Sequence, residues 1–152
     1  MFKVAIFLTL VIQVAFGGLI DFTDCGSTKA KVLTVKLEPC EGKPCELHKG
    51  DDASIEIRFK IDEDVDAGDV RVTLQNGNVL KPLPLREPEI CSNVTPECPL
   101  KKDVKKIYTY KYQVKLSDKY AAAPFTAKLE MKETNKRPFM CIKFGGVLKE
   151  KV

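Results

Sequence analysis

Strict alternation of apolar and polar side chains constrains the fold of this chain more than any other feature of its sequence. Residues 54–61 place Ile55, Ile57 and Phe59 on one face and charged side chains on the other. The same period of two recurs over residues 69–75, 107–116, 125–132 and 140–144, and a less regular apolar pattern covers 32–37. Because successive side chains of a strand point to opposite faces, this pattern predicts half-buried antiparallel strands.

Turn signals lie between the predicted strands. The segments 49–52 and 75–78 contain Gly or Asn, which supply positive φ at low cost. Prolines remove ladder donors, so the proline-rich residues 81–88 should form an extended edge segment. Six or seven strands, each with one apolar face, can bury those faces by pairing two sheets or by closing a barrel. The short strands favour an all-β sandwich of two antiparallel sheets with about seven strands.

An apolar segment opens the chain. A basic start at Lys3 is followed by a nearly continuous apolar run over 4–16, with the small residues Ala15 and Gly17 at its end. The run is too short to span a bilayer comfortably, which disfavours the alternative of a membrane anchor. We expect residues 1–17 to be a cleaved signal peptide and residues 18–152 to form a single domain of the secreted protein.

Six cysteines follow this segment, at positions 25, 40, 45, 91, 98 and 141. Secretion exposes them to an oxidising compartment, where disulfides are their usual fate. Six cysteines allow fifteen pairings, and the sequence alone does not choose among them. Short loops cost less entropy to close, which favours pairing 40 with 45 and 91 with 98 and leaves 25 with 141. Zinc binding is the less favoured alternative, because the spacings differ from the usual C-x2-C.

Catalytic constellations are missing from the sequence. His48 is the single histidine, and no Gly-rich phosphate loop is present. Asp62, Asp64 and Asp66 fall in a predicted turn and are interpreted as solvated charge. The alternative, a calcium site, would lack the glycine and the glutamate of an EF-hand loop. We therefore expect neither an enzyme nor a cofactor or metal site.

The charge pattern gives few further clues. The net charge of +4 is mild, and no Lys/Arg run is long enough to indicate nucleic-acid binding. The densest basic cluster, 101–106, is interpreted as a solvated surface, with a contact to anionic lipid headgroups or to a ligand carboxylate as the alternative. Residues 93–95 form a glycosylation sequon between Cys91 and Cys98, so we expect a glycan on Asn93, although Pro96 follows directly.

Several short motifs extend over nearly the whole chain after residue 17. They are Asp-Cys-Gly at 24–26, Glu-Pro-Cys at 38–40, Pro-Cys-Glu-Leu-His-Lys-Gly at 44–50, Pro-Leu-Pro-Leu at 82–85, Cys-Pro-Leu-Lys-Lys-Asp at 98–103, Tyr-Thr-Tyr at 108–110 and Cys141. In these motifs, and in the order and spacing of all six cysteines, the chain resembles the ML lipid-recognition domain family. That family includes the Niemann–Pick type C2 sterol carriers and the mite group 2 allergens.

The resemblance implies an immunoglobulin-like β-sandwich with the disulfides Cys25–Cys141, Cys40–Cys45 and Cys91–Cys98. It also implies a lipid cavity between the sheets, whereas alternation alone predicts a filled core, since protein interiors are close-packed. Leu83 takes the place of the aromatic residue that the family's Pro-Phe-Pro segment presents to a sterol. The candidate ligand-binding residues are the apolar side chains Ile55, Ile57, Phe59, Val72, Leu74, Leu83, Leu85, Tyr110, Tyr112, Val114, Phe125, Leu129, Met131, Ile142 and Phe144.

The function that the resemblance implies is non-enzymatic lipid binding and transfer, with sterol transport as the leading case. We expect a secreted monomer, extracellular or delivered to the lysosomal lumen, whose ligand is a sterol, a fatty acid or a similar lipid. The expected partners are a lysosomal or cell-surface receptor and, transiently, membranes, but not nucleic acid. The alternatives are a recognition module for microbial lipid in innate immunity, an extracellular semiochemical carrier, and an adhesion sandwich without a ligand.

Overall fold

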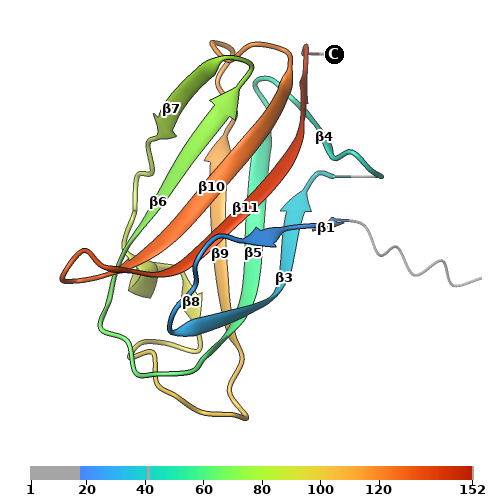
Figure 1. Ribbon diagram of the computed structural model, residues 1–152. Helices are drawn as coiled ribbons and strands as arrows, with labels where there is room; N and C mark the ends of the chain where they lie inside the picture. Colours follow the sequence, from blue (N-terminus) through green and yellow to red (C-terminus); the bar gives the residue numbers. More distant parts are fainter. Residues whose placement is uncertain (1–17, 41, 152) are drawn as a thin grey trace, which may run out of the picture.

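Two β-sheets pack face to face in the computed structural model, which describes residues 18–40 and 42–151 (Figure 1). Within these residues, seven strands have five residues or more and four are shorter. The elements are β1 (Leu19–Ile20), β2 (Thr23–Asp24), β3 (Ala30–Glu38), β4 (Glu46–His48), β5 (Asp52–Ile61), β6 (Ala67–Asn76), β7 (Val79–Leu83), the short 3-10 turn η1 (Ile90–Ser92), β8 (Val94–Thr95), β9 (Tyr108–Lys115), β10 (Pro124–Glu133) and β11 (Pro138–Lys149). The expected signal peptide, residues 1–17, lies outside the described residues. In the part of the chain that the structure describes, no helix is long and apolar enough to cross a membrane.

The first sheet has the order β1-β3-β5-β9-β8 and is antiparallel throughout. Ile57 of the central strand β5 lies opposite Val35 of β3 and Tyr110 of β9. All three side chains are buried. Alternation predicts this burial for one face of each strand.

The second sheet has the order β2-β11-β10-β6-β7. Leu129 of β10 lies opposite Val72 of β6 and Ile142 of β11, and all three are buried. The proline-rich segment begins as the edge strand β7, where Pro82 lies opposite Thr73. The predicted sandwich of two antiparallel sheets is therefore confirmed, with one exception: the short strand β4 pairs with β11 in parallel.

Gly146 of β11 permits this parallel pairing. The backbone N–H of Val147 donates to the carbonyl oxygen of Cys45 at 2.8 Å, which brings the segment before β4 against β11. A Cβ atom on Gly146 would lie 2.8 Å from that carbonyl oxygen and 2.9 Å from Cζ of Phe125. The missing side chain therefore lets the β4 segment and the Phe125 ring approach β11 at the same place.

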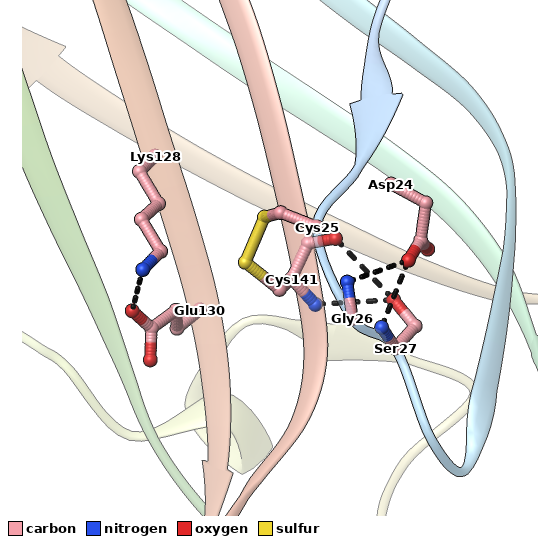
Figure 2. Close-up of a disulfide and its surroundings, with 7 residues drawn as sticks. All are labelled: Asp24, Cys25, Gly26, Ser27, Lys128, Glu130 and Cys141. Atoms are coloured by element: carbon pink, nitrogen blue, oxygen red, sulfur yellow. Dashed lines mark hydrogen bonds and ion pairs between the residues drawn. A yellow bond between two sulfur atoms is a disulfide. The ribbon is translucent and has the colours of Figure 1, made fainter.

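Three disulfides join Cys25 to Cys141, Cys40 to Cys45 and Cys91 to Cys98. The Cα atoms of the long-range pair, Cys25 and Cys141, are 4.9 Å apart, although 116 positions separate these residues in the sequence. The bond ties the segment after β2 to β11, as Figure 2 shows. The other two disulfides close short loops, with 5 and 7 positions between their cysteines.

Asp24 organises the turn beside the Cys25–Cys141 disulfide (Figure 2). Its Oδ1 accepts hydrogen bonds from the backbone N–H groups of Gly26 at 2.9 Å and Ser27 at 2.8 Å. Ser27 Oγ in turn accepts a hydrogen bond from the N–H of Cys141 at 3.1 Å. Burial opposes the charge of Asp24, but the hydrogen bonds from Ser27 and Gly26 outweigh it, so the pKa of Asp24 lies below its ordinary value of 3.8.

Candidate functional site

A narrow apolar cavity lies between the two sheets. Its volume is about 80 Å³. Both sheets contribute to its walls, together with the segment after β7 and the connection between β9 and β10. The lining residues are Leu37, Leu47, Ala53, Ile55, Val72, Leu74, Asn76, Leu83, Leu85, Tyr110, Tyr112, Val114, Leu116, Tyr120, Phe125, Ala127, Leu129, Phe144 and Leu148.

The cavity occupies the half of the interior next to the β6–β7 turn, at the upper end in Figure 1, and we call this part the hollow half. Ala53 of β5 and Ala127 of β10 are buried there and project too little to fill it. The other end, the packed half, contains the fully buried side chains of Phe59, Tyr108 and Met131. The rings of Phe59 and Tyr108 stack with centroids 5.7 Å apart. The hollow half exists because alanines stand where close packing would need large side chains.

Eleven of the fifteen candidate ligand-binding residues line this cavity. They are Ile55, Val72, Leu74, Leu83, Leu85, Tyr110, Tyr112, Val114, Phe125, Leu129 and Phe144. The other four, Ile57, Phe59, Met131 and Ile142, are buried and do not line the cavity. Ile57 and Ile142 lie opposite two lining residues in the paired strands, Tyr110 and Leu129. Alternation identifies the inward face of a strand, but it does not show where along the strand the facing side chains stop filling the interior.

The remaining eight lining residues were not among those candidates. They are Leu37, Leu47, Ala53, Asn76, Leu116, Tyr120, Ala127 and Leu148. Alternation already places Leu116 and Ala127 on inward faces, so this signal could have found them. Leu47 and Leu148 line the cavity because β4 pairs with β11, and no local pattern indicates that pairing.

Asn76 closes one end of the hollow half, although the sequence placed it in a turn. Its side chain is only 7% exposed. Its amide accepts a hydrogen bond from the N–H of Ala121 at 2.9 Å and donates one to the carbonyl oxygen of Ala121 at 3.0 Å. These two bonds fix the β9–β10 connection, whose Leu116 and Tyr120 line the cavity. The next residue, Gly77, has φ +62° and forms the tight β6–β7 turn.

The cavity has a mouth on one side, where half-buried lining residues lie near the edge of the sandwich. We define the mouth by five of these residues: Leu83, Leu85, Tyr112, Tyr120 and Phe125. They belong to β7 and the segment after it, to the second half of β9, and to the beginning of β10 and the connection before it. The Tyr112 hydroxyl accepts hydrogen bonds from the N–H groups of Arg86 at 2.8 Å and Glu87 at 3.3 Å, which ties β9 to the segment after β7.

The cavity is an uncharged space. None of its lining residues carries a charged side chain, and the polar atoms of Asn76 are paired with Ala121. Burial raises the pKa of the Tyr110 hydroxyl well above its ordinary value, so this group stays neutral. Such a lining favours apolar molecules over ions, because an ion would lose its hydration without compensation.

The other polar candidates do not line the cavity. Asn93 is half-buried, and its Nδ2 donates to the carbonyl oxygens of Glu87 and Glu89, both at 3.3 Å. Glycosylation of Asn93 stays a prediction. Asp64 of the acidic turn accepts a hydrogen bond from the N–H of Lys102 at 2.8 Å. Within the described residues, no group of three or more His, Cys, Asp and Glu side chains could hold a metal ion.

Residues 20–145 match the family model described as the ML domain. The chain belongs to the ML domain family. Its relatives in this family include the NPC intracellular cholesterol transporter 2 of Danio rerio, 27% identical over 125 residues that cover 82% of each chain. The mite group 2 allergen Tyr p 2 of Tyrophagus putrescentiae is 35% identical over 107 residues, which are 70% of this chain and 72% of the allergen.

A solved structure of the same kind supports this membership. The crystal structure of a Niemann-Pick type C2 protein from the Japanese carpenter ant matches with a TM-score of 0.72 and 26% identity. The match covers 85% of this chain and 99% of the ant protein. The resemblance to the ML family is therefore confirmed both by sequence and by fold.

Proposed function

We propose that this ML-domain protein binds and transfers a lipid without catalysing a reaction. The observation that carries the proposal is the apolar, uncharged cavity of the hollow half, with its mouth between the segment after β7 and β9. The name of the Danio rerio relative, a cholesterol transporter, supports the same conclusion. The ligand would be a sterol, a fatty acid or a similar apolar molecule.

Burial of apolar surface would supply the binding free energy. Each buried CH2 contributes about 0.8 kcal/mol, so a chain of about 14 methylenes gains about 11 kcal/mol. The loss of free motion on association takes back about 4 kcal/mol or more. The remainder corresponds to binding in the micromolar range, provided that most of the chain is buried.

Loading of the cavity would require the mouth to widen. Ligand pockets usually have volumes of about 300–1,000 Å³, and the present cavity of about 80 Å³ is much smaller. The side chains of Leu83 and Leu85 are half-buried and lie at the edge of the sandwich, so they can move without unpacking the opposite half. The Cys25–Cys141 disulfide would keep the N-terminal segment on β11 while the sheets part.

The proposed setting is outside the cytoplasm. Residues 1–17 would be removed as a signal peptide, and residues 18–152 would act as one secreted, monomeric domain. Three disulfides support this setting, because such bonds form and persist in oxidising compartments. Delivery to the lysosomal lumen, a receptor and brief contact with membranes belong to the same proposal.

Lipid extraction from the purified protein tests the proposal. The protein is secreted from a eukaryotic host, purified and denatured, and the released lipid is quantified by mass spectrometry. We expect a sterol, a fatty acid or a similar lipid at close to one molecule per chain. A second sample is incubated with a bacterial lipid extract before denaturation, and recovery of acylated microbial glycolipid alone would favour a recognition module instead. An empty protein that also takes up no fluorescent sterol or fatty acid would contradict the proposal.

A further inference from the structure

Three tyrosines alternate along the inner face of β9, and the hydroxyls of two of them are hydrogen-bonded. Tyr108 Oη accepts a hydrogen bond from the N–H of Lys101 at 2.9 Å and donates to the carbonyl oxygen of Pro99 at 3.3 Å. Tyr112 Oη accepts a hydrogen bond from the N–H of Arg86 at 2.8 Å. Each of these hydroxyls thus has a fixed place in the protein.

Tyr110, which lies between them in the strand, is different. It is 1% exposed, and its buried hydroxyl has no hydrogen-bond partner among residues 18–40 and 42–151. Its ring lies almost parallel to that of Tyr112, with centroids 6.4 Å apart and an interplanar angle of 4°, and it lines the cavity. Buried hydroxyls are normally paired, because an unpaired one has lost its hydration without compensation.

Among the described residues the Tyr110 hydroxyl has no partner, and a phenol can donate one hydrogen bond as well as accept one. Burial raises the pKa of this phenol, so it keeps its proton and offers an O–H donor. A ligand in the cavity could supply an acceptor to this donor.

We infer that Tyr110 donates a hydrogen bond to an uncharged oxygen of the bound lipid, such as a hydroxyl, a ketone or an ester carbonyl. The inference rests on the proposed function and deepens it, because it names neutral oxygenated lipids as the preferred class. A plain hydrocarbon would leave the hydroxyl unpaired, whereas an oxygenated lipid pairs it. The difference between these two states is the source of the selectivity.

The lining explains why the buried oxygen is uncharged. None of the cavity-lining residues is charged, and Asn76 already pairs with Ala121. A carboxylate beside Tyr110 would lose its hydration and meet one donor and no cation, which is a costly arrangement. A fatty acid would therefore keep its carboxylate at the mouth, in water, and would not use Tyr110.

Displacement of an apolar dye tests the inference. The delipidated protein is loaded with N-phenyl-1-naphthylamine, which is then displaced by 1-dodecanol, by tridecane or by laurate. Tridecane matches dodecanol in its number of non-hydrogen atoms. The dissociation constants are measured for the wild type, for Tyr110→Phe and for Tyr112→Phe. The last variant is a matched control, because it removes the same atom from a parallel ring whose hydroxyl already has protein partners.

We expect Tyr110→Phe to raise the dissociation constant of dodecanol about tenfold. The dissociation constants of tridecane and laurate should stay within about twofold of their wild-type values. Tyr112→Phe should change the dissociation constants of all three compounds by the same factor. Tyr110→Phe loses no hydrogen bond within the protein and removes an unpaired buried hydroxyl, so its melting temperature should be no lower than that of the wild type. A dodecanol affinity that Tyr110→Phe leaves unchanged would overturn the inference. An equal loss of affinity for tridecane would also overturn it. An equal loss of affinity for laurate would refute the claim that the oxygen paired with Tyr110 is uncharged.

Infrared spectroscopy gives a direct second readout. A ketone that accepts a hydrogen bond absorbs at lower frequency, so bound 2-tridecanone should show a lower carbonyl stretch in the wild type than in Tyr110→Phe. Equal frequencies would contradict the inference. If no compound displaces the dye from the wild type, the proposed function fails and the inference fails with it. If all variants bind all compounds as the wild type does, lipid binding stands and only the role of Tyr110 is refuted.

Discussion

Replacement of Ala127 by leucine would fill the hollow half from within. Ala127 is 2% exposed and lines the cavity between Leu74 of β6 and Phe144 of β11. Leucine adds three carbon atoms at this point, and a ligand must give up a similar amount of buried surface. At about 0.8 kcal/mol per carbon, the loss is about 2.4 kcal/mol, which weakens binding about 50-fold.

The same substitution should change the stability of the empty protein little. The added carbons gain about 2 kcal/mol by burial, and crowding costs about 1–3 kcal/mol, so the free energy of unfolding should stay within about 1 kcal/mol of the wild type. Binding is measured by dye displacement and stability by urea unfolding. Thr126→Leu is the control, because it places the same side chain on the exposed outer face of β10. A folded Ala127→Leu protein that binds lipid as tightly as the wild type would refute the cavity as the binding site.

Three further predictions concern the framework around the cavity. Replacing both Cys25 and Cys141 by serine opens a loop of 116 positions, which should lower the free energy of unfolding by about 5 kcal/mol and speed lipid release; unchanged urea unfolding and release rate would contradict this. Asn76→Ala removes both bonds to Ala121, so it should cost about 1–3 kcal/mol and speed lipid exchange in stopped-flow dye release, and an unchanged exchange rate would speak against a closing role. Because the pKa of Asp24 is lowered in the folded state, its contribution to stability is full above the unfolded value of 3.8 and is lost as pH falls through the folded value. The free energy of unfolding of Asp24→Asn should lack this pH-dependent contribution. If the variant and the wild type show the same pH dependence in acid unfolding, Asp24 does not stabilise the turn in this way.

The sequence predicted the sandwich well because its strands depend on a local pattern. One apolar face per strand leads to two facing sheets, and Ile57 and Leu129 occupy the inward positions that alternation assigns to them. The pattern fails on β11, where Phe139 and Cys141 are buried on the opposite face from Met140. The segment after β2 lies alongside β11 there, because the N–H of Cys25 donates to the carbonyl oxygen of Cys141 at 2.9 Å and the two residues form a disulfide. A contact between the two ends of the chain leaves no period in the sequence.

The position of the cavity could not be predicted from the residues alone. Ala53 and Ala127 are ordinary small residues in a strand pattern, and a void arises only because the side chains facing them do not fill the remaining space. The unpaired hydroxyl of Tyr110 was equally hidden, since Tyr108 and Tyr112 have the same place in the alternation and both find partners. Pairing of this kind depends on loops from elsewhere in the chain.

Methyl NMR during titration with a lipid tests most directly whether the hollow half holds the ligand. Leu74, Val114 and Leu148 line the cavity, whereas Ile61 and Leu100 are buried and do not line it. Titration with 1-dodecanol should shift the methyl signals of the first three residues and produce contacts between their protons and the alkyl chain. The methyl signals of Ile61 and Leu100 should move little. Shifts confined to exposed residues, or no shifts at saturating lipid, would contradict lipid binding between the sheets.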